Sequence, residues 1–130
     1  MAGEYADAAA DFTKAIELHP ANGNLYRNRA LAYLKMGNNE SAISDFSNAL
    51  RLNLDPSLVP DTYNDRGVAY LRNKKAADAI SDFTKAIQLR PIAAYYMNRS
   101  EAYAALGDGE HAAQDRTEAI RLDPNVPTHN

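Results

Sequence analysis

Residue types able to do covalent or metal chemistry are few and scattered in this chain. The three histidines, His19, His111 and His129, fall after an expected helix end, in an expected first helical turn and in the C-terminal tail, and no two have metal-ligand spacing. No cysteine is present, which excludes a thiolate nucleophile, a disulfide framework and a cysteine zinc site. No serine lies in a nucleophile elbow, and no glycine-rich loop suits a phosphate. The sequence therefore predicts a chain that is not an enzyme and that binds no metal or cofactor.

Arginine and aspartate, in contrast, recur at fixed places. Arg29, Arg66 and Arg99 each follow an asparagine or an aspartate, which on its own suggests a phosphate-binding set. A series of aspartates recurs with the same period: Asp11, Asp45, Asp82 and Asp115. Because a guanidinium binds a carboxylate through two parallel hydrogen bonds, we predict that these pairs join neighbouring helices and are structural. On this hypothesis, replacing Arg66 lowers stability and leaves ligand affinity intact.

The composition is typical of a folded, soluble protein. Of 130 residues, 45% are hydrophobic and 24% are charged, and the net charge is −3. This charge is small and mixed in sign, and no run of lysine or arginine is present, which argues against nucleic-acid binding. No apolar stretch reaches the ~18 residues of a membrane span, and the acidic start MAGEYADAAADF does not resemble a signal peptide. We therefore expect no membrane partner and a cytoplasmic location.

A repeat of about 34 residues organises the chain. Equivalent positions separated by 34, 37 and 33 residues are occupied by Ala8, Ala42, Ala79 and Ala112. The same shifts align a second set of positions: Phe12, Phe46, Phe83 and Arg116. Each unit closes at a proline, and these prolines are Pro20, Pro56, Pro91 and Pro124. Self-similarity at this period indicates a solenoid of repeated helical units.

Each complete unit has the pattern of two amphipathic helices. In the second unit the apolar faces of these two helices are formed by Tyr26, Ala30, Tyr33 and Leu34, and by Ala42, Phe46, Ala49 and Leu50. The small residues allow two helices to approach closely, and the aromatic side chains fill the space beside them. Gly37 and Gly107 can adopt the left-handed conformation that ends a first helix. In the third unit Asn73 and Lys74 stand there, and because asparagine tolerates that conformation at small cost we still expect a turn.

Together, the period, the helix pairs, the tyrosine and small-residue pattern and the closing prolines resemble the tetratricopeptide repeat. The resemblance covers about residues 3–124 and recurs three and a half times. It implies an all-α fold, a right-handed superhelical solenoid of antiparallel helix pairs with about seven helices. The expected units of this single array are residues 3–22 (a second helix only), 23–56, 60–92 and 93–126.

The resemblance also implies a concave groove, lined by the first helix of each unit, in which relatives hold a peptide. The residues expected to face it mix amides, charges and apolar groups: Asn24, Arg27, Asn28, Leu31, Lys35, Asp61, Asn64, Asp65, Val68, Arg72, Met97, Asn98 and Glu101. Such a surface suits an extended or helical peptide whose backbone and side chains both need partners. The acids favour a partner with lysine or arginine. The alternative is that these residues form only a solvated face and that binding uses another face or the ends of the array.

One binding mode of the family can be compared residue by residue. Adaptors that resemble this array grip the carboxylates of acidic C-terminal tails with lysine, asparagine and arginine side chains. In this chain Asn28 fits one of those places, whereas Asp61 and Asp65 fall where a lysine and an arginine are needed. Because like charges repel, the sequence argues against an acidic tail as the partner.

The first expected helix, residues 5–18, has an apolar face that no preceding helix covers. This face is formed by Ala8, Phe12, Ala15 and Ile16. Terminal repeats normally carry a polar outer side, so either the chain is a fragment of a longer protein or another copy covers the face by self-association. We expect a scaffold or adaptor that binds another protein. The alternatives are a docking or regulatory segment of a larger enzyme and a structural self-assembly module.

Overall fold

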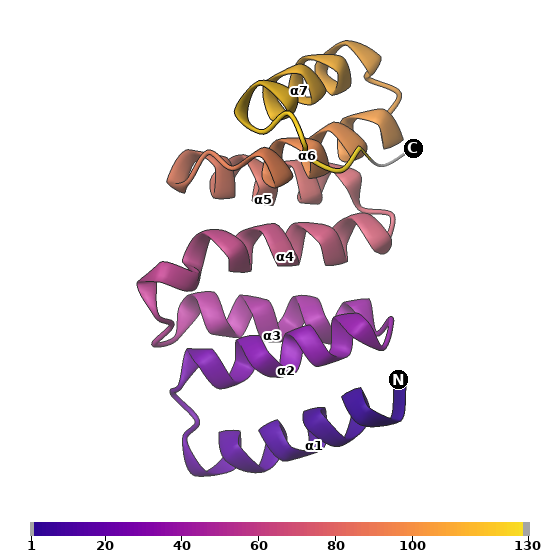
Figure 1. The fold of residues 1–130 in the computed structure, drawn as a ribbon. Coiled ribbons are helices and arrows are strands. Elements are labelled where there is room, and N and C mark those ends of the chain that lie inside the picture. Colours follow the sequence, from indigo (N-terminus) through magenta and orange to yellow (C-terminus); the bar gives the residue numbers. More distant parts are fainter. Residues whose placement is uncertain (1, 129–130) are drawn as a thin grey trace.

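The computed structural model describes residues 2–128, and helices make up most of this part of the chain (Figure 1). The α-helices are α1 (Ala2–Leu18), α2 (Gly23–Lys35), α3 (Asn39–Arg51), α4 (Val59–Arg72), α5 (Ala76–Leu89), α6 (Ala93–Ala105) and α7 (Gly109–Leu122). A short 3-10 helix, η1 (Pro56–Leu58), fills the longer junction before α4. Over these residues the β-type pairing is limited to an isolated bridge between Asn22 and Asn53. The predicted all-α fold with seven helices is confirmed.

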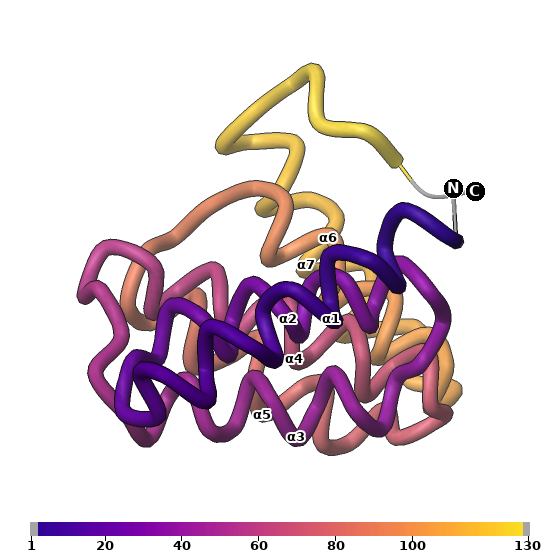
Figure 2. The backbone as a smooth tube through the Cα atoms, turned by 90° about the horizontal axis from the view of Figure 1, so that it is seen from below, coloured from indigo at the N-terminus to yellow at the C-terminus, as the bar shows by residue number. Residues whose placement is uncertain are grey.

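Neighbouring helices pack in pairs, and the pairs stack into a solenoid. Within the pairs α2 packs on α3, α4 on α5 and α6 on α7, while α3 packs on α4 and α5 on α6 between them. Viewed along the stack, α3 and α5 lie on one side and α2 and α4 on the other (Figure 2). In addition α2 contacts α4, and α4 contacts α6. The first helices therefore form one continuous layer, which is where the sequence predicts the groove.

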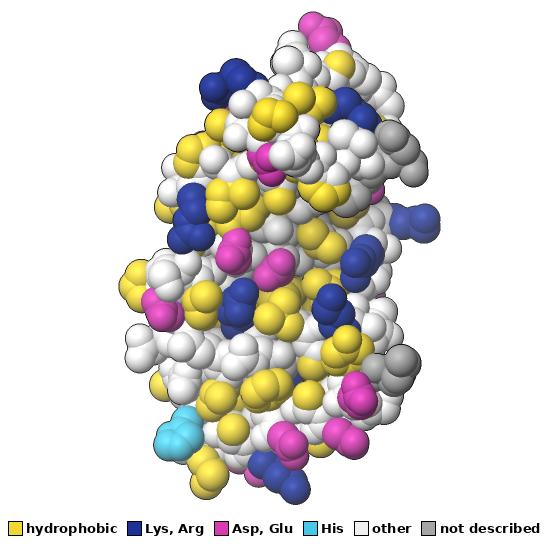
Figure 3. Space-filling view, viewed as in Figure 1, with side chains coloured by type: hydrophobic (Ala, Val, Ile, Leu, Met, Phe, Trp, Pro, Cys, Tyr) yellow, Lys and Arg dark blue, Asp and Glu magenta, His cyan; other side chains and the backbone are white. Residues whose placement is uncertain are grey.

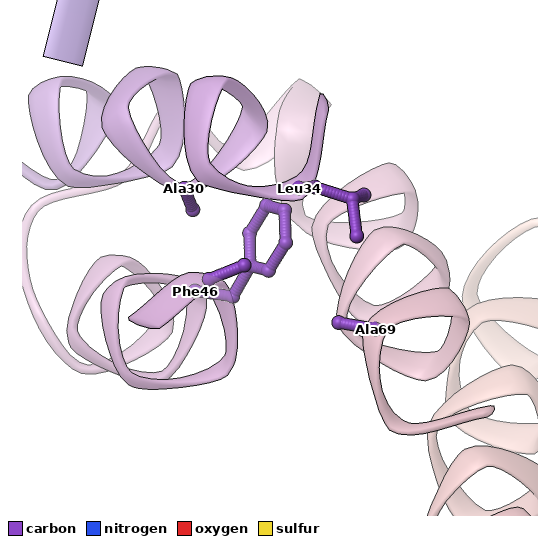
Figure 4. Packing of buried hydrophobic residues seen from close by; sticks show 5 residues of the cluster. Ala30, Leu34, Phe46 and Ala69 are labelled. Atoms are coloured by element: carbon purple, nitrogen blue, oxygen red, sulfur yellow. The ribbon is translucent and has the colours of Figure 1, made fainter. Parts of the chain in front are cut away.

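An aromatic ring between small side chains holds each of the middle pairs together. Phe46 of α3 is fully buried, and its ring lies against Ala30 and Leu34 of α2 (Figure 4). Burying a phenylalanine side chain in this way stabilises the fold by about 1.5–3 kcal/mol. Phe83 of α5 is equally buried, and a Cβ added to Gly67 of α4 would lie 2.6 Å from its ring. The predicted role of small residues as close-approach positions is confirmed.

The recurring arginines cross-link the stack. Arg66 of α4 donates two hydrogen bonds of 2.8 Å to the carboxylate of Asp82 on α5 and a third of 3.0 Å to the hydroxyl of Ser47 on α3. Its guanidinium lies 5.6 and 5.8 Å from the ring centroids of Tyr63 and Tyr70. The same hydrogen bonds recur in the other two units, from Arg29 to Asp45 and Thr13, and from Arg99 to Asp115 and Thr84. The predicted structural role is confirmed, and each arginine also reaches the preceding unit.

The turns inside the pairs contain the residues with positive φ. Gly37 and Gly107 have φ values of 79° and 80°, as predicted. In the third unit the left-handed residue is Lys74, with φ 61°, whereas Asn73 has φ −89°. The predicted turn is present, and its left-handed residue is Lys74 because Lys74 stands at the position equivalent to the two glycines. The packing of the two helices fixes that place in the turn and overrides the preference of asparagine for this conformation.

The two ends of the array differ. α1 begins at Ala2 rather than at residue 5, and α2 is the one helix against which it packs in the described chain. Ile16 is 8% exposed, so its assignment to the uncovered face is wrong, because it lies on the side of α1 that this contact buries. Phe12 remains half-buried. At the other end Val126, after α7, is buried in a cluster with residues of α6 and α7.

Candidate functional site

Polar side chains of α2, α4 and α6 meet on the layer of first helices. Arg27 of α2 donates from Nε to the hydroxyl of Thr62 on α4 at 3.1 Å, and its Nη2 lies 3.6 Å from Oδ2 of Asp65. Asn98 of α6 donates from Nδ2 to Oδ1 of Asn64 on α4 at 2.9 Å. We call this surface the groove, and its proposed residues are Arg27, Asn28, Leu31, Lys35, Asp61, Asn64, Asp65, Val68, Arg72, Asn98 and Glu101. Its polar contacts run without a break across three helices.

The carboxyl of Asp65 is strongly perturbed by its place in the groove. The side chain is 24% exposed, and the loss of hydration raises its pKa from 3.8 to about 6. The carboxylate of Asp61 also raises the pKa, whereas Arg27, Lys35 and a hydrogen bond from Asn64 lower it. The 3.6 Å separation from Arg27 is too long for a hydrogen bond. At neutral pH the groove therefore holds a carboxylate that an added positive charge would stabilise.

Asp61 lies one helical turn before Asp65 on α4 and accepts a hydrogen bond from a side chain of α6. The phenol of Tyr95, a residue that is 2% exposed, donates a hydrogen bond to Oδ1 of Asp61. Burial and the nearby carboxylate raise the pKa of Tyr95, so the phenol remains a donor at physiological pH. The sequence-based set of groove residues omitted Tyr95. Its place three residues before Asn98, on the same face of α6, is the signal that identifies it.

A pocket of 430 Å³ opens between α4 and α6 beside these contacts. Val68 and Leu71 form its apolar part, and Arg72, Asn98 and Glu101 form its polar part. Arg72 and Glu101 are exposed, so they are available to a bound chain. At the level of α4, Figure 3 shows acidic and basic side chains next to apolar ones. The pocket can therefore accept an apolar side chain while charged groups around it bind polar neighbours.

Two of the residues predicted to face the groove serve the scaffold instead. Met97 is 2% exposed and packs in a cluster with Ala119, because its long apolar side chain gains more from the α6–α7 core than from solvent. Asn24 accepts a hydrogen bond of 3.0 Å from the backbone N–H of Asp55 and holds the junction after α3. Leu31 is half-buried and packs against the core cluster of the second unit, as Val68 does, so both remain in the proposed groove.

Histidines and acids elsewhere also have local structural partners. The ring of His111 stacks on Tyr103 with 5.0 Å between the centroids, and its Nδ1 lies 2.7 Å from Oδ2 of Asp108. His129 lies outside the described residues. Across residues 2–128 no group of three histidine, cysteine, aspartate or glutamate side chains could hold a metal ion. A search of the same residues finds no helix with the length and apolar content needed to span a membrane.

Known sequences that are similar to this chain agree with its pattern of paired helices. The family model "Tetratricopeptide repeat" matches residues 2–52, 27–92 and 64–127. Hsc70-interacting protein 1 of Drosophila melanogaster is 30% identical over 120 residues, which is 92% of this chain and 22% of that protein. Tetratricopeptide repeat and J domain-containing co-chaperone DNJ1 of Cryptococcus neoformans var. grubii is 45% identical over 51 residues, 39% of this chain and 10% of that protein. The chain thus spans less than a quarter of the length of these relatives.

Solved structures show the same architecture. MamA superimposes with a TM-score of 0.88 at 20% identity, over 95% of this chain and 71% of that chain, which shows the fold alone. The first tetratricopeptide repeat domain of Spaghetti (RPAP3), bound to the HSP90 peptide SRMEEVD, has a TM-score of 0.73 at 28% identity, over 80% of this chain and 81% of that chain. Since the family model matches nearly the whole chain and the helix pairs agree with it, this chain belongs to the tetratricopeptide repeat family.

Proposed function

We propose that this chain is a protein-interaction module that binds a segment of a partner protein in the groove. The observation that carries the proposal is the place of the Asp65 carboxyl, which is 24% exposed and lies 3.6 Å from Nη2 of Arg27, too far for a hydrogen bond. Its raised pKa of about 6 agrees with an ionised form that is poorly compensated in the free array. Holding such a charge lowers the stability of the fold, and a bound positive group offsets that loss. The adjacent pocket gives the same segment an apolar contact on Val68 and Leu71.

The bound segment in this proposal carries lysine or arginine. Asp61 and Asp65 both lie on α4, and the charge of Asp61 already raises the pKa of Asp65. A basic side chain placed between them removes this repulsion, and the exposed carboxylate of Glu101 on α6 adds a third acidic contact. Charge complementarity thus favours a basic or mixed segment over an acidic one.

An acidic peptide is the second candidate, because the repeat domain of RPAP3 is bound to SRMEEVD and Hsc70-interacting protein 1 is similar over 92% of this chain. In this chain such a peptide would depend on Arg27, Lys35 and Arg72. The carboxylates of Asp61 and Asp65 stand among these cations, so the acidic peptide meets repulsion in the middle of the groove. For this reason we rank it second.

Selection from a phage-displayed library of random dodecapeptides tests both candidates, with the synthetic peptide SRMEEVD measured beside the selected peptides by isothermal titration calorimetry. We expect lysine and arginine to be enriched and Asp65→Asn to weaken binding about tenfold, equal to about 1.4 kcal/mol. The double variant Asn64→Ala, Asn98→Ala should also weaken binding. The control Asp78→Asn removes an exposed acid of α5, outside the groove, and should change nothing.

Two outcomes would contradict this proposal in different ways. Tight binding of SRMEEVD together with no enrichment of basic residues would exclude a basic segment as the partner. The groove would then remain the proposed binding site. Selected peptides that bind the Asn64→Ala, Asn98→Ala variant as well as the wild type would exclude the groove itself. Circular dichroism of each variant shows whether a loss of binding comes from a loss of fold.

We further propose that the array itself carries no catalytic activity and works in the cytoplasm as a scaffold or adaptor. The absence of catalysis is supported by the buried acids Asp45, Asp82 and Asp115, which are all used in the arginine cross-links. A larger protein of which the array forms a part, including an enzyme that it docks or regulates, is compatible with the short coverage of the relatives. Fluorescence microscopy of a tagged chain tests the location.

A further inference from the structure

The face of α1 that points away from α2 repeats the residues that bind a first helix elsewhere in the array. Its residues Ala8, Asp11, Phe12 and Ala15 are equivalent to Ala42, Asp45, Phe46 and Ala49 of α3. The four residues of α3 are at most 3% exposed. In α1, by contrast, Asp11 is exposed and Phe12 is half-buried. The same chemical surface is therefore covered in one unit and open in another, and we call the open one the α1 face.

The covered copies show which helix fits this surface. Each first helix presents a tyrosine, an arginine three residues later, a small residue directly after it and a second tyrosine: Tyr26, Arg29, Ala30 and Tyr33; Tyr63, Arg66, Gly67 and Tyr70; Tyr96, Arg99, Ser100 and Tyr103. Each arginine binds the aspartate of the second helix through two hydrogen bonds of 2.7–2.8 Å. No side chain within residues 2–128 donates to Asp11 in this way. The exposed carboxylate therefore selects for an arginine.

A second copy of this chain does not offer a free helix of the required kind. α2 is packed between α1 and α3, α4 between α3 and α5, and α6 between α5 and α7. Each carries its arginine already bound to an aspartate. A second copy would have to open its own core before it could present one of them. A second copy is therefore disfavoured as the occupant.

We propose that the α1 face binds an amphipathic helix of a partner protein, with an arginine of that helix bound to Asp11 and the small residue after it seated on Phe12. Tyrosines three residues before and four residues after the arginine would flank the guanidinium, as they do in the three complete units. The surface lies outside the groove, so the two sites can be occupied at the same time. The module would thus have a second binding site, which binds a helix rather than an extended segment.

A synthetic peptide with the sequence of residues 22–38, labelled with fluorescein, is the probe for this site. It contains the tyrosine, arginine and alanine pattern of α2 together with its N-cap Asn22. Fluorescence anisotropy with the whole chain should show saturable binding, and Asp11→Asn should weaken it about tenfold because the charge-assisted hydrogen bonds are lost. Exchanging the charges, with Asp11→Arg in the protein and Arg29→Asp in the peptide, should restore most of the affinity.

The controls separate this site from others. Glu17→Gln removes an exposed acid of α1 outside this face, and Asp65→Asn alters the groove, so neither should change the affinity for the probe. Absence of binding, or equal binding to wild type and Asp11→Asn with an unchanged circular dichroism spectrum, would overturn the proposal. Equal binding would mean that the probe does not use Asp11, as would be the case if it displaced α2 from Asp45. Self-association in sedimentation that Asp11→Asn abolishes would assign the face to a second copy and overturn it too.

Discussion

Replacing Asp65 by asparagine should stabilise the fold at neutral pH. The carboxyl pKa of about 6 in the folded state lies above the ordinary value of 3.8, so the folded chain holds this proton more tightly than the unfolded chain. Below pH 3.8 the carboxyl is mostly protonated in both the folded and the unfolded chain, so it does not destabilise the fold. The loss of stability grows between pH 3.8 and about pH 6 and is complete above about pH 6. The gap between the two values corresponds to about 3 kcal/mol. Asparagine keeps the shape of the side chain and avoids this cost.

Urea denaturation followed by circular dichroism measures the effect at about pH 4 and about pH 7.5. We expect the free energy of unfolding of Asp65→Asn to exceed that of the wild type by up to about 3 kcal/mol at the higher pH and to match it within about 0.5 kcal/mol at the lower pH. The control Glu17→Gln, at an exposed position of α1, should stay within about 0.5 kcal/mol of the wild type at both.

Two results would refute this reasoning. An advantage of Asp65→Asn that is the same at both pH values would show that it does not come from the ionised carboxylate. A variant less stable than the wild type at about pH 7.5 would show that the attraction to Arg27 outweighs the loss of hydration. In the second case the groove would contain a satisfied ion pair, and the argument for a basic partner would fail with it.

Two further substitutions test the scaffold by urea denaturation. Arg66→Ala should lower the free energy of unfolding by about 3–5 kcal/mol, since it leaves the buried carboxylate of Asp82 without its two hydrogen bonds. Arg121→Ala removes an exposed pair and should cost less than about 1 kcal/mol, so equal losses would contradict a structural role for Arg66. Lys74→Gly should raise stability by about 0.5 kcal/mol, because glycine adopts a positive φ without strain, and a loss would show that the lysine conformation is unstrained.

The sequence alone predicts the fold well because its signals repeat. The pattern around Phe46 appears again around Phe83, so one interpretation of spacing places several helices and their buried faces at once. Where a prediction failed, a packing contact decided the outcome. Met97 has the register of a groove residue, yet its apolar side chain turns into the core beside Ala119. Tyr95 was missed although it lies three residues before Asn98 on α6, because its partner Asp61 belongs to the preceding unit.

Differences between the units show why Asp65 points to function. Positions that hold the stack together carry the same residue in each complete unit, as Arg29, Arg66 and Arg99 do. Positions facing the groove vary: the equivalents of Asp65 are Asn28 and Asn98, both uncharged. An asparagine is thus compatible with the scaffold at this place, and α4 alone among the three first helices has a charge there, at a cost of about 3 kcal/mol. Since the fold does not require this charge, we propose that binding accounts for it.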